Sequence, residues 1–365
     1  MNHYGLDLAW YISAPGLAWD TALKITKVQL ELLIDSDMLL TNEMAAEQES
    51  QQYHTATLKP TMNIWEQSSI LLRILNSSRL DANKLYGWAM SKQLPTSGFK
   101  WMTDDELDDC KHMSCILEVD LEYAEDLHDL HNDYSLAPKR VKIGNVVKLI
   151  SNLNNKTNYV VYNENLKLYQ SLGLKITKIH RGIKFQESLW LEEYINLNTE
   201  LRTKVKQSGN NFEEDFFKQM NNSVFGKTLE NIRNRVDIRL ISTDKVAQKL
   251  AAKPSYDCCT IFDKNLIAVH MKKKKLYFNK PVYLGMRILD LSKSLMYDFH
   301  YNYIKTTYGA NAKLLFTETE SLADEIRTKD FYKDINHDIE KRFDTSDYPT
   351  NHPSGIKTGL NSKVL

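Results

Sequence analysis

Hydrophobic residues recur at helical spacing most clearly over residues 212–235. An apolar residue recurs every four positions along part of this segment, as expected for the buried face of an amphipathic helix. The stripe consists of Phe212, Phe216, Met220 and Val224. We predict that this face of the helix packs against a core.

The opposite face of the same helix carries side chains that could bind a ligand. At about 100° per residue, Lys218, Asn222 and Phe225 project together, away from the apolar stripe. Gly226 follows, and glycine inside a helix costs about 1 kcal/mol relative to alanine, which suggests that something approaches the backbone there. A cation, an amide and an aromatic ring can meet a phosphate and a base. A solvated helix face is the structural alternative.

The pattern before residue 110 is less regular. Residues 15–40 open with Pro-Gly and predict a helix followed by a short strand, whereas the polar, Gln-rich residues 43–63 predict a loop. The apolar run 70–75 is cut by residues 76–79, which interrupts the strand expected there. The acidic cluster 104–109 predicts a solvated helix start.

Later segments complete the expected organisation. Short apolar stretches between 115 and 190 predict a small mixed subdomain. Residues 280–305 predict a strand followed by an aromatic-rich helix, and residues 344–365 predict polar turns.

Composition narrows the class of protein. The 365 residues are 42% hydrophobic, and 47 basic residues balance 47 acidic ones, so any polyanion must be held by local patches. No apolar run reaches the roughly 18 residues that span a bilayer, and the start lacks a signal-peptide pattern. The four cysteines form no C-x-x-C pair. We therefore expect a soluble protein in a reducing, intracellular setting; "CKHMSC" favours loop thiols over a zinc site.

Two further stretches carry carboxylates. In "LLFTETESLADEI", Glu318 and Glu320 follow an apolar run, and residues two apart in an extended chain point to the same side. Such a pair binds a divalent metal or is an exposed strand end. "LDANKLYGWAM" places Asp81 before a strand-to-helix turn, with Tyr86 about one helical turn beyond it.

The order of these groups resembles motifs A, B and C of family B DNA polymerases. The matching positions are Asp81 with Tyr86, then Lys218, Asn222, Ser223, Phe225 and Gly226, then Glu318, Thr319, Glu320 and Ser321. The surrounding sequence, including "NNSVFGKTLENIRNRVDIRL" and "DLHNDYSLAP", resembles the protein-primed, organellar and viral branch carried by Polinton (Maverick) transposons.

The resemblance implies an α/β fold: a palm with an antiparallel sheet, helical fingers and an inserted subdomain. We expect the divisions to be a pre-palm segment 1–43, an atypical connector 44–79, palm 80–94, an insertion 95–190 that contacts the priming protein, fingers 191–240, palm 241–343 and a tail 344–365 before a missing thumb.

The resemblance to family B polymerases also implies the roles of the site residues. Asp81 and Glu320 would bind two Mg²⁺ ions, or Mn²⁺, with Glu318 as a further catalytic carboxylate. Tyr86 would stack below the sugar. The other nucleotide contacts would be Lys218, Asn222, Phe225 and Gly226, with Lys204 or Lys206 as an additional phosphate contact. The implied partners are primer-template DNA, a deoxynucleoside triphosphate and a terminal priming protein, with no membrane, in the nucleus.

Departures from the family pattern predict impaired activity. Motif C of the family reads D-T-D-S, whereas Glu318 and Glu320 replace both aspartates here. An added methylene moves a carboxylate by about 1 Å, and Mg²⁺ demands near-ideal geometry. The Gly-rich segment that couples exonuclease to polymerase is absent, and no exonuclease or thumb is expected within the chain. We interpret the chain as a fragment from a mobile element.

Two other functions remain open. An inactive remnant could hold nucleic acid through Lys218, Arg233, Arg235 and residues 272–275, although such charges are also ordinary on a solvated surface. A metal-dependent nuclease could use the same carboxylates, but Lys218 to Gly226 would then have no purpose.

Overall fold

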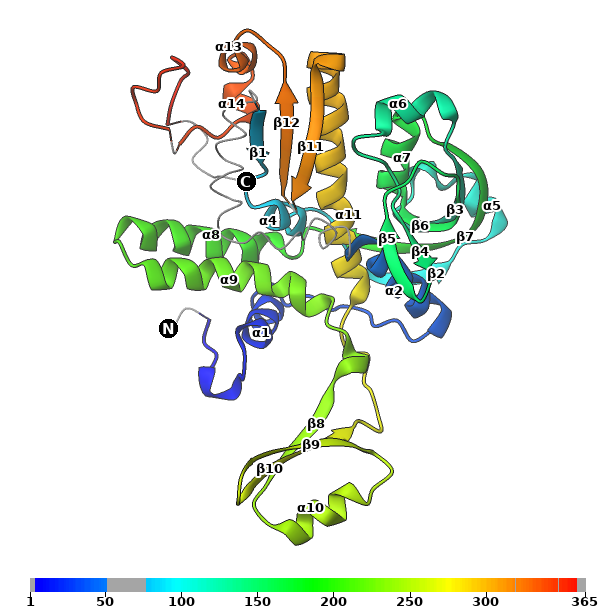
Figure 1. Cartoon of the computed structure of the whole chain (residues 1–365), viewed down its shortest axis with the longest axis vertical. Coiled ribbons are helices and arrows are strands. Elements are labelled where there is room, and N and C mark those ends of the chain that lie inside the picture. The colour runs from blue at the N-terminus through cyan, green and yellow to red at the C-terminus, as the bar shows by residue number, and fades with distance from the viewer. Residues whose placement is uncertain (1–3, 51–76, 319, 347, 360–365) are drawn as a thin grey trace. The chain divides into compact units, whose positions relative to one another are not determined.

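The computed structural model describes residues 4–50, 77–318, 320–346 and 348–359 (Figure 1). Residues 229–280 form one unit, and the described residues up to 228 and from 281 form the other. Each unit is described by itself. No helix within these ranges is long and apolar enough to cross a membrane.

A three-stranded antiparallel sheet joins distant parts of the larger unit. Its order is β1 (Ser77–Asp81), β12 (Ser321–Ile326) and β11 (Ala312–Glu318). The expected interruption at residues 76–79 is wrong for Ser77 to Arg79, which continue the ladder with β12. An edge strand needs only backbone pairing on one side, so polar residues do not stop it.

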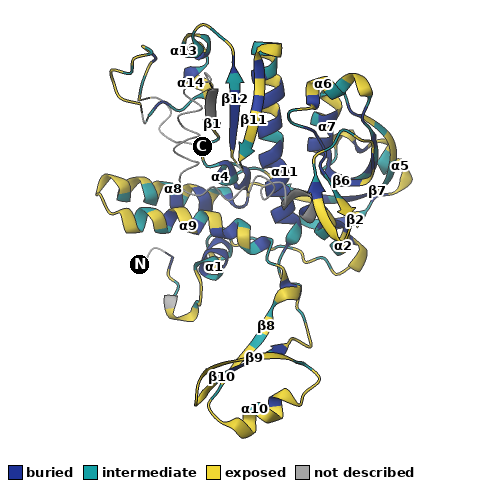
Figure 2. Ribbon diagram, in the orientation of Figure 1, coloured by how far each residue is buried: buried dark blue, intermediate teal, exposed yellow. Residues whose placement is uncertain are grey.

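One long helix packs against this sheet. The helix α11 (Val282–Asp298) continues into a π-helical segment, η5 (Phe299–Lys305). Figure 2 shows α11 as largely buried, and its side chains enter two cores: Met296 packs beneath the β1-β12-β11 sheet, while Tyr297 and Tyr301 join the core of a second sheet. The strand expected before this helix is wrong, because burial on nearly all sides removes the helical period from the sequence.

The second sheet belongs to the expected mixed subdomain. Its order is β2 (Leu94–Trp101), β7 (Lys175–Ser188), β3 (Cys115–Glu122) and β6 (Lys156–Tyr162), all antiparallel. It is accompanied by α5 (Asp104–Asp108), α6 (His128–His131), α7 (Asn163–Ser171) and the hairpin of β4 (Lys139–Ile143) and β5 (Val146–Ile150). The helix start predicted at residues 104–109 is confirmed, with a Thr103–Glu106 capping box.

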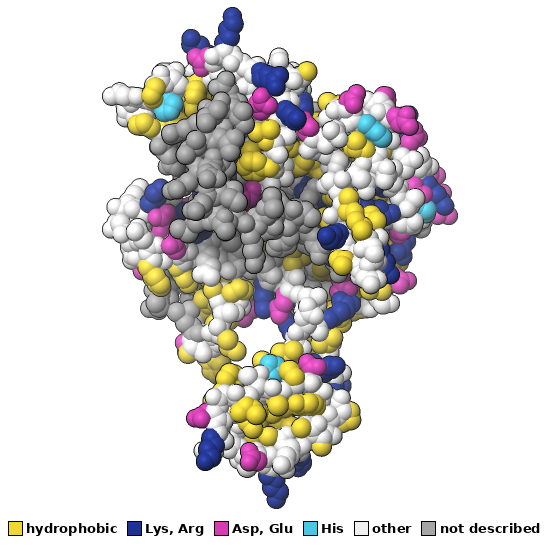
Figure 3. Space-filling model, in the orientation of Figure 1, with side chains coloured by type: hydrophobic (Ala, Val, Ile, Leu, Met, Phe, Trp, Pro, Cys, Tyr) yellow, Lys and Arg dark blue, Asp and Glu magenta, His cyan; other side chains and the backbone are white. Residues whose placement is uncertain are grey.

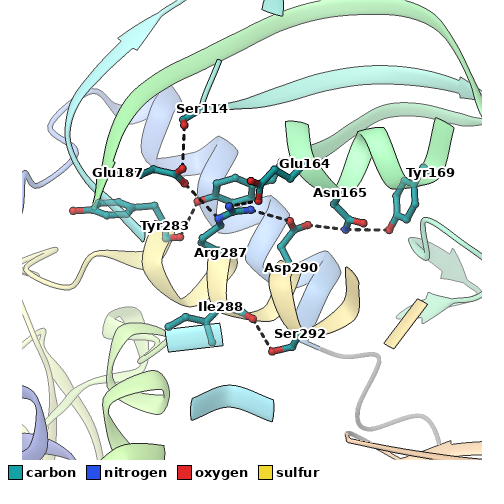
Figure 4. A network of polar contacts seen from close by, with 11 residues as sticks. Ser114, Glu164, Asn165, Tyr169, Glu187, Tyr283, Arg287, Ile288, Asp290 and Ser292 are labelled. Carbon is teal, nitrogen blue, oxygen red and sulfur yellow. Dashed lines mark hydrogen bonds and ion pairs between the residues drawn. The ribbon is translucent and has the colours of Figure 1, made fainter. Parts of the chain in front are cut away.

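A buried ionic cluster ties α11 to this second sheet (Figure 4). The Arg287 guanidinium lies 3.4 Å from Glu187 Oε1 and 3.7 Å from Asp290 Oδ2, and it also pairs with Glu164. It covers the Tyr162 ring at 4.8 Å. One cation therefore compensates carboxylates from both the helix and the sheet.

The larger unit contains eight further α-helices within the described residues, of which α2, α4 and α9 pack on α11. They are α1 (Ala14–Thr26), α2 (Ser36–Ser50), α4 (Leu85–Met90), α8 (Glu192–Gln207), α9 (Asn211–Thr228), α12 (Thr306–Tyr308), α13 (Phe331–Ile335) and α14 (Ile339–Arg342). Two expectations are wrong: residues 27–35 form no strand, and residues 43–50 are helical rather than a loop. Glu, Gln and Ala are good helix formers, and α2 packs on α11. Residues 51–63 and 70–75 lie outside the described residues.

The smaller unit is a three-stranded sheet with one helix. Its strands β8 (Val236–Ile241), β10 (Leu266–Lys272) and β9 (Tyr256–Asp263) pair in that order, and α10 (Asp244–Ala251) covers Val269 and Met271 through Leu250. Exposed apolar side chains of its strands are Val236, Ile238, Leu240, Ile261, Phe262 and Leu266 (Figure 3). The helix expected over 212–235 ends at Thr228. Residues that we had divided between fingers and palm at 240 therefore fold together.

The cysteines are all free thiols. Cys110 and Cys115 are buried beside β3 in the core of the second sheet, so they are core residues and not the loop thiols that we expected. Cys258 and Cys259 are exposed on β9. None of the four belongs to a metal-binding group within the described residues.

Candidate functional site

The hairpin between β11 and β12 presents the two glutamates. Glu318 pairs with Ser321, so the chain reverses between them and Glu320 lies in the turn. The expectation that both glutamates project from one extended strand is therefore wrong, because the strand ends at Glu318. Both glutamates are nevertheless exposed at the same end of the sheet.

Asp81 reaches the same end of the sheet from the neighbouring strand. It is the register partner of Ser321, whose hydroxyl donates to Asp81 Oδ1. The backbone amide of Ala82 donates to the carbonyl of Glu320 at 2.7 Å. Asp81 is thus seated beside a hairpin 240 residues further along the chain. Ser321 therefore has a structural role, since it binds Asp81. In the sequence only its place in motif C marked it.

The turn after β1 leads directly to an aromatic contact. Lys84 adopts the left-handed conformation (φ 47°) and α4 begins at Leu85, so the strand-to-helix turn predicted here is confirmed. Tyr86 in its first turn stacks on Phe225 of α9, with ring centroids 4.5 Å apart and planes 14° from parallel. The structure therefore joins the segment that follows Asp81 to the helix that carries Lys218.

The helix α9 turns a different face to the core than we predicted. Met220 and Val224 are fully buried, but Phe212 is 73% exposed, and Phe217 takes the buried position instead of Phe216. A repeat of four residues drifts by about 40° per step on a helix of 3.6 residues per turn, so the three steps from Phe212 to Val224 turn the stripe by about 120° around the helix.

The polar face of α9 is open. Lys218, Asn222 and Gly226 are exposed, and a Cβ added at Gly226 would meet no atom within 4 Å. Among the described residues, packing therefore does not explain why glycine stands at this helical position, where it costs about 1 kcal/mol relative to alanine. The exposure of Lys218 and Asn222 agrees with the predicted orientation, and their role stays a prediction.

A partner helix holds α9 in place. Tyr194 of α8 donates to the Met220 carbonyl at 3.1 Å, and Arg202 pairs with Glu214 at 3.0 Å. Lys204 and Lys206 follow, both exposed in the last turn of α8. The two helices thus form an antiparallel pair whose exposed cations include the candidate phosphate contacts.

The side chains at this end of the sheet carry the kind of ligand atom that a hard metal ion binds. Asp81, Glu318 and Glu320 offer carboxylate oxygens, which Mg²⁺ prefers. In the described part of the chain, however, no three acidic, histidine or cysteine side chains are grouped closely enough to hold a metal ion. Two carboxylates with backbone and water oxygens would have to suffice, and Mg²⁺ usually keeps several waters.

Comparison with known proteins gives consistent matches. The model of the family described as DNA polymerase type B, organellar and viral, matches residues 75–306. The phi29 DNA polymerase complexed with primer-template DNA and incoming nucleotide is 14% identical with a TM-score of 0.53, over 91% of this chain and 51% of that one. The same polymerase with single-stranded DNA gives a TM-score of 0.50 at 14% identity, over 91% and 50%. No curated protein matches.

These matches confirm the α/β fold that the sequence resemblance implied. The chain spans about half the length of the phi29 polymerase chains that it matches.

Proposed function

Because the chain belongs to the organellar and viral type B DNA polymerases, we propose that it is the nucleotidyl-transfer core of a polymerase that copies a mobile element. The observation that carries this proposal is the pairing of β1 with β12, which seats Asp81 against Ser321 and beside Glu320. Primer-template DNA and a deoxynucleoside triphosphate are the substrates, since the similar phi29 structure is complexed with both.

The carboxylates at the sheet end would hold the metal. Asp81 and Glu320 supply the oxygens, with Glu318 beside them on β11. Divalent metal bound there would activate the primer hydroxyl and neutralise charge on the phosphates. The Ser321 hydroxyl donates to Asp81 Oδ1 and so helps to hold this carboxylate at the sheet end. This arrangement orients one carboxylate before any ligand binds.

The α9 face would hold the nucleotide. Lys218 would neutralise the triphosphate, and Asn222 would donate to the nucleotide. Gly226 would let the nucleotide approach the backbone, because no atom of the described residues would lie within 4 Å of a Cβ there. Tyr86 and Phe225, stacked on each other, would form an aromatic wall against the sugar and base. Lys204 or Lys206 would add a phosphate contact at the end of α8.

Further partners follow from the same proposal. The sheet within residues 95–190 would meet a terminal priming protein, and the polymerase would work in the nucleus on transposon DNA. We also propose that motif C works below the family's usual rate, because Glu318 and Glu320 are longer than the aspartates of the family pattern.

Binding of nucleic acid without synthesis is the second candidate. The unit of residues 229–280 contains 12 lysine and arginine residues against five acidic ones, in a chain that is neutral as a whole. Its arginines are engaged, since Arg235 pairs with Glu230 at 2.7 Å and Arg233 covers the Phe278 ring at 4.8 Å. Lys273 to Lys275 are exposed and would supply the charge for phosphate contacts.

Single-nucleotide incorporation on a primer-template tests the polymerase proposal. We expect the full chain to extend the primer with Mn²⁺ and more slowly with Mg²⁺, and Asp81→Asn to abolish extension. Asp129→Asn, an exposed acid on α6, is the matched control and keeps the activity. DNA binding without extension under both metals would favour the second candidate. Degradation of single-stranded DNA that depends on Asp81 would instead support a nuclease.

A further inference from the structure

A histidine and an aspartate lie buried together beneath the motif C strand. His300 of η5 and Asp324 of β12 are both fully buried, and His300 Nδ1 lies 3.9 Å from Asp324 Oδ1. Neither ring nitrogen and neither carboxylate oxygen has a hydrogen-bond partner in the described part of the structure. Buried polar groups are normally satisfied, so two such groups facing each other need an explanation.

The charged groups around the pair are few and already engaged. Lys305 donates to the Ala312 carbonyl at 2.8 Å and lies 3.5 Å from Asp133. His131 shares a hydrogen bond of 2.8 Å with Tyr123. The Tyr134 ring meets His300 edge-on at 5.4 Å. The imidazole and the carboxyl are therefore each other's nearest available partners.

Burial sets where a proton resides in this pair. It raises the pKa of Asp324 from 3.8 to about 7, with Lys305 opposing and Asp133 adding to the shift. It lowers the pKa of His300 from 6.5 to about 4, helped by Lys305 and opposed by Asp133. Between about pH 4 and 6.5 the folded protein thus holds the proton on the carboxyl, whereas the unfolded chain holds it on the imidazole. Folding therefore shifts one proton from the imidazole to the carboxyl, and the protein takes up no proton from the solvent.

The position of the pair connects it to the candidate site. Asp324 sits on the central strand β12, opposite Ser78 of β1 and Leu314 of β11. Three residues earlier on the same strand, Ser321 binds Asp81. His300 lies in a π-helical segment, a rare geometry that is frequent at functional sites.

We propose that His300 and Asp324 are a positioning pair that shares one proton, fixes β12 against η5 and thereby sets the place of the Glu318–Ser321 hairpin beside Asp81. An approach of about 1 Å would close the gap to a hydrogen bond between carboxyl and imidazole. The pair is then neutral, which avoids the cost of burying two charges. The role of the pair in catalysis rests on the proposed function, whereas the shared proton does not.

The pH dependence of unfolding by urea tests the shared proton. In the unmodified chain the two groups cancel between about pH 4 and 6.5, because folded and unfolded states bind the same number of protons. Asp324→Asn leaves His300 alone, so stability should fall as the pH is lowered from 6.5 toward 4. His300→Gln leaves Asp324 alone, so stability should fall as the pH is raised from 4 toward 7. Each slope approaches about tenfold in the folding equilibrium constant per pH unit.

Hydrogen exchange of the Ala82 amide tests the positioning. This amide donates to the Glu320 carbonyl, so its protection reports how the hairpin sits against β1. Both variants should speed its exchange beyond their effect on global stability. Ser292→Ala, which loses a buried hydrogen bond of 2.8 Å on α11 but no titratable group, is the control and should not.

Equal slopes in the two variants would overturn the shared proton, and unchanged Ala82 protection would overturn the positioning role. Neither measurement needs catalysis, so an inactive chain would refute the proposed function and leave this inference standing.

Discussion

Replacing Arg287 by methionine should destabilise the larger unit strongly. Only 3% of the Arg287 side chain is exposed, and it lies between the side chains of Glu187 and Asp290, which are 7% and 1% exposed. Methionine keeps much of the apolar volume, so the main loss is the charge that compensates these carboxylates. Removing one partner of a buried ion pair costs about 3–5 kcal/mol.

The partner carboxylates respond unequally to such changes. Glu164 is 60% exposed, so Glu164→Gln should cost less than about 1 kcal/mol and serves as the matched control. Glu187→Gln combined with Arg287→Met should recover part of the loss, because one uncompensated carboxylate is removed. Urea unfolding at constant pH measures all four proteins.

The loss should also depend on pH with a definite sign. Burial already raises the pKa of Glu187 although Arg287 faces it. Without Arg287 the folded Glu187 carboxyl would bind a proton still more readily, so the variant is least impaired in acid and loses stability as the pH rises through the folded pKa of Glu187. The difference from the unmodified chain should therefore be larger near pH 8 than near pH 5. A loss below about 1 kcal/mol, or one that grows in acid, would refute this account of the cluster.

Two further changes address the candidate site. Glu318→Asp with Glu320→Asp should raise primer extension with Mg²⁺ on the order of 10²-fold, because about 1 Å of misplacement costs roughly that factor; an unchanged rate with DNA binding intact would mean that side-chain length does not limit the reaction. Gly226→Ala should stabilise α9 by about 1 kcal/mol, since its Cβ meets open space, yet weaken nucleotide binding measured by titration. Undiminished affinity would remove Gly226 from the binding face.

Local order along the chain singled out the candidate site residues, whose roles stay predictions, but it did not give the orientation of the helix that carries several of them. Asp81 and Tyr86 were found from a strand-to-helix turn, and Glu318 and Glu320 from an apolar run, because residue type and local order determine such signals. The phase of α9 was wrong: Phe212 fits a repeat of four as well as Phe217 fits the true repeat, and only the neighbouring α8 and α1 decide between them.

The family resemblance implied that Asp81 meets the segment of Glu318 to Ser321, but the other long-range contacts could not be predicted. Residues 282–305 read as a strand and a helix because α11 is buried between two sheets, which removes its polar face. Nothing in the local sequence connects Asp324 with His300, 24 positions earlier. The strand at Ser77–Arg79 could not be predicted locally either, because its partner β12 lies more than 200 residues later in the chain.

The pairing of Asp81 with Ser321 has a consequence for biosynthesis. At about 5–20 residues per second, the ribosome needs roughly 10–50 s to make the 240 residues between them. During that time β1 lacks β12, the strand with which it pairs in the described part of the sheet. This sheet is thus completed late in synthesis, and until then the unpaired edge of β1 is a place where another chain could pair with it.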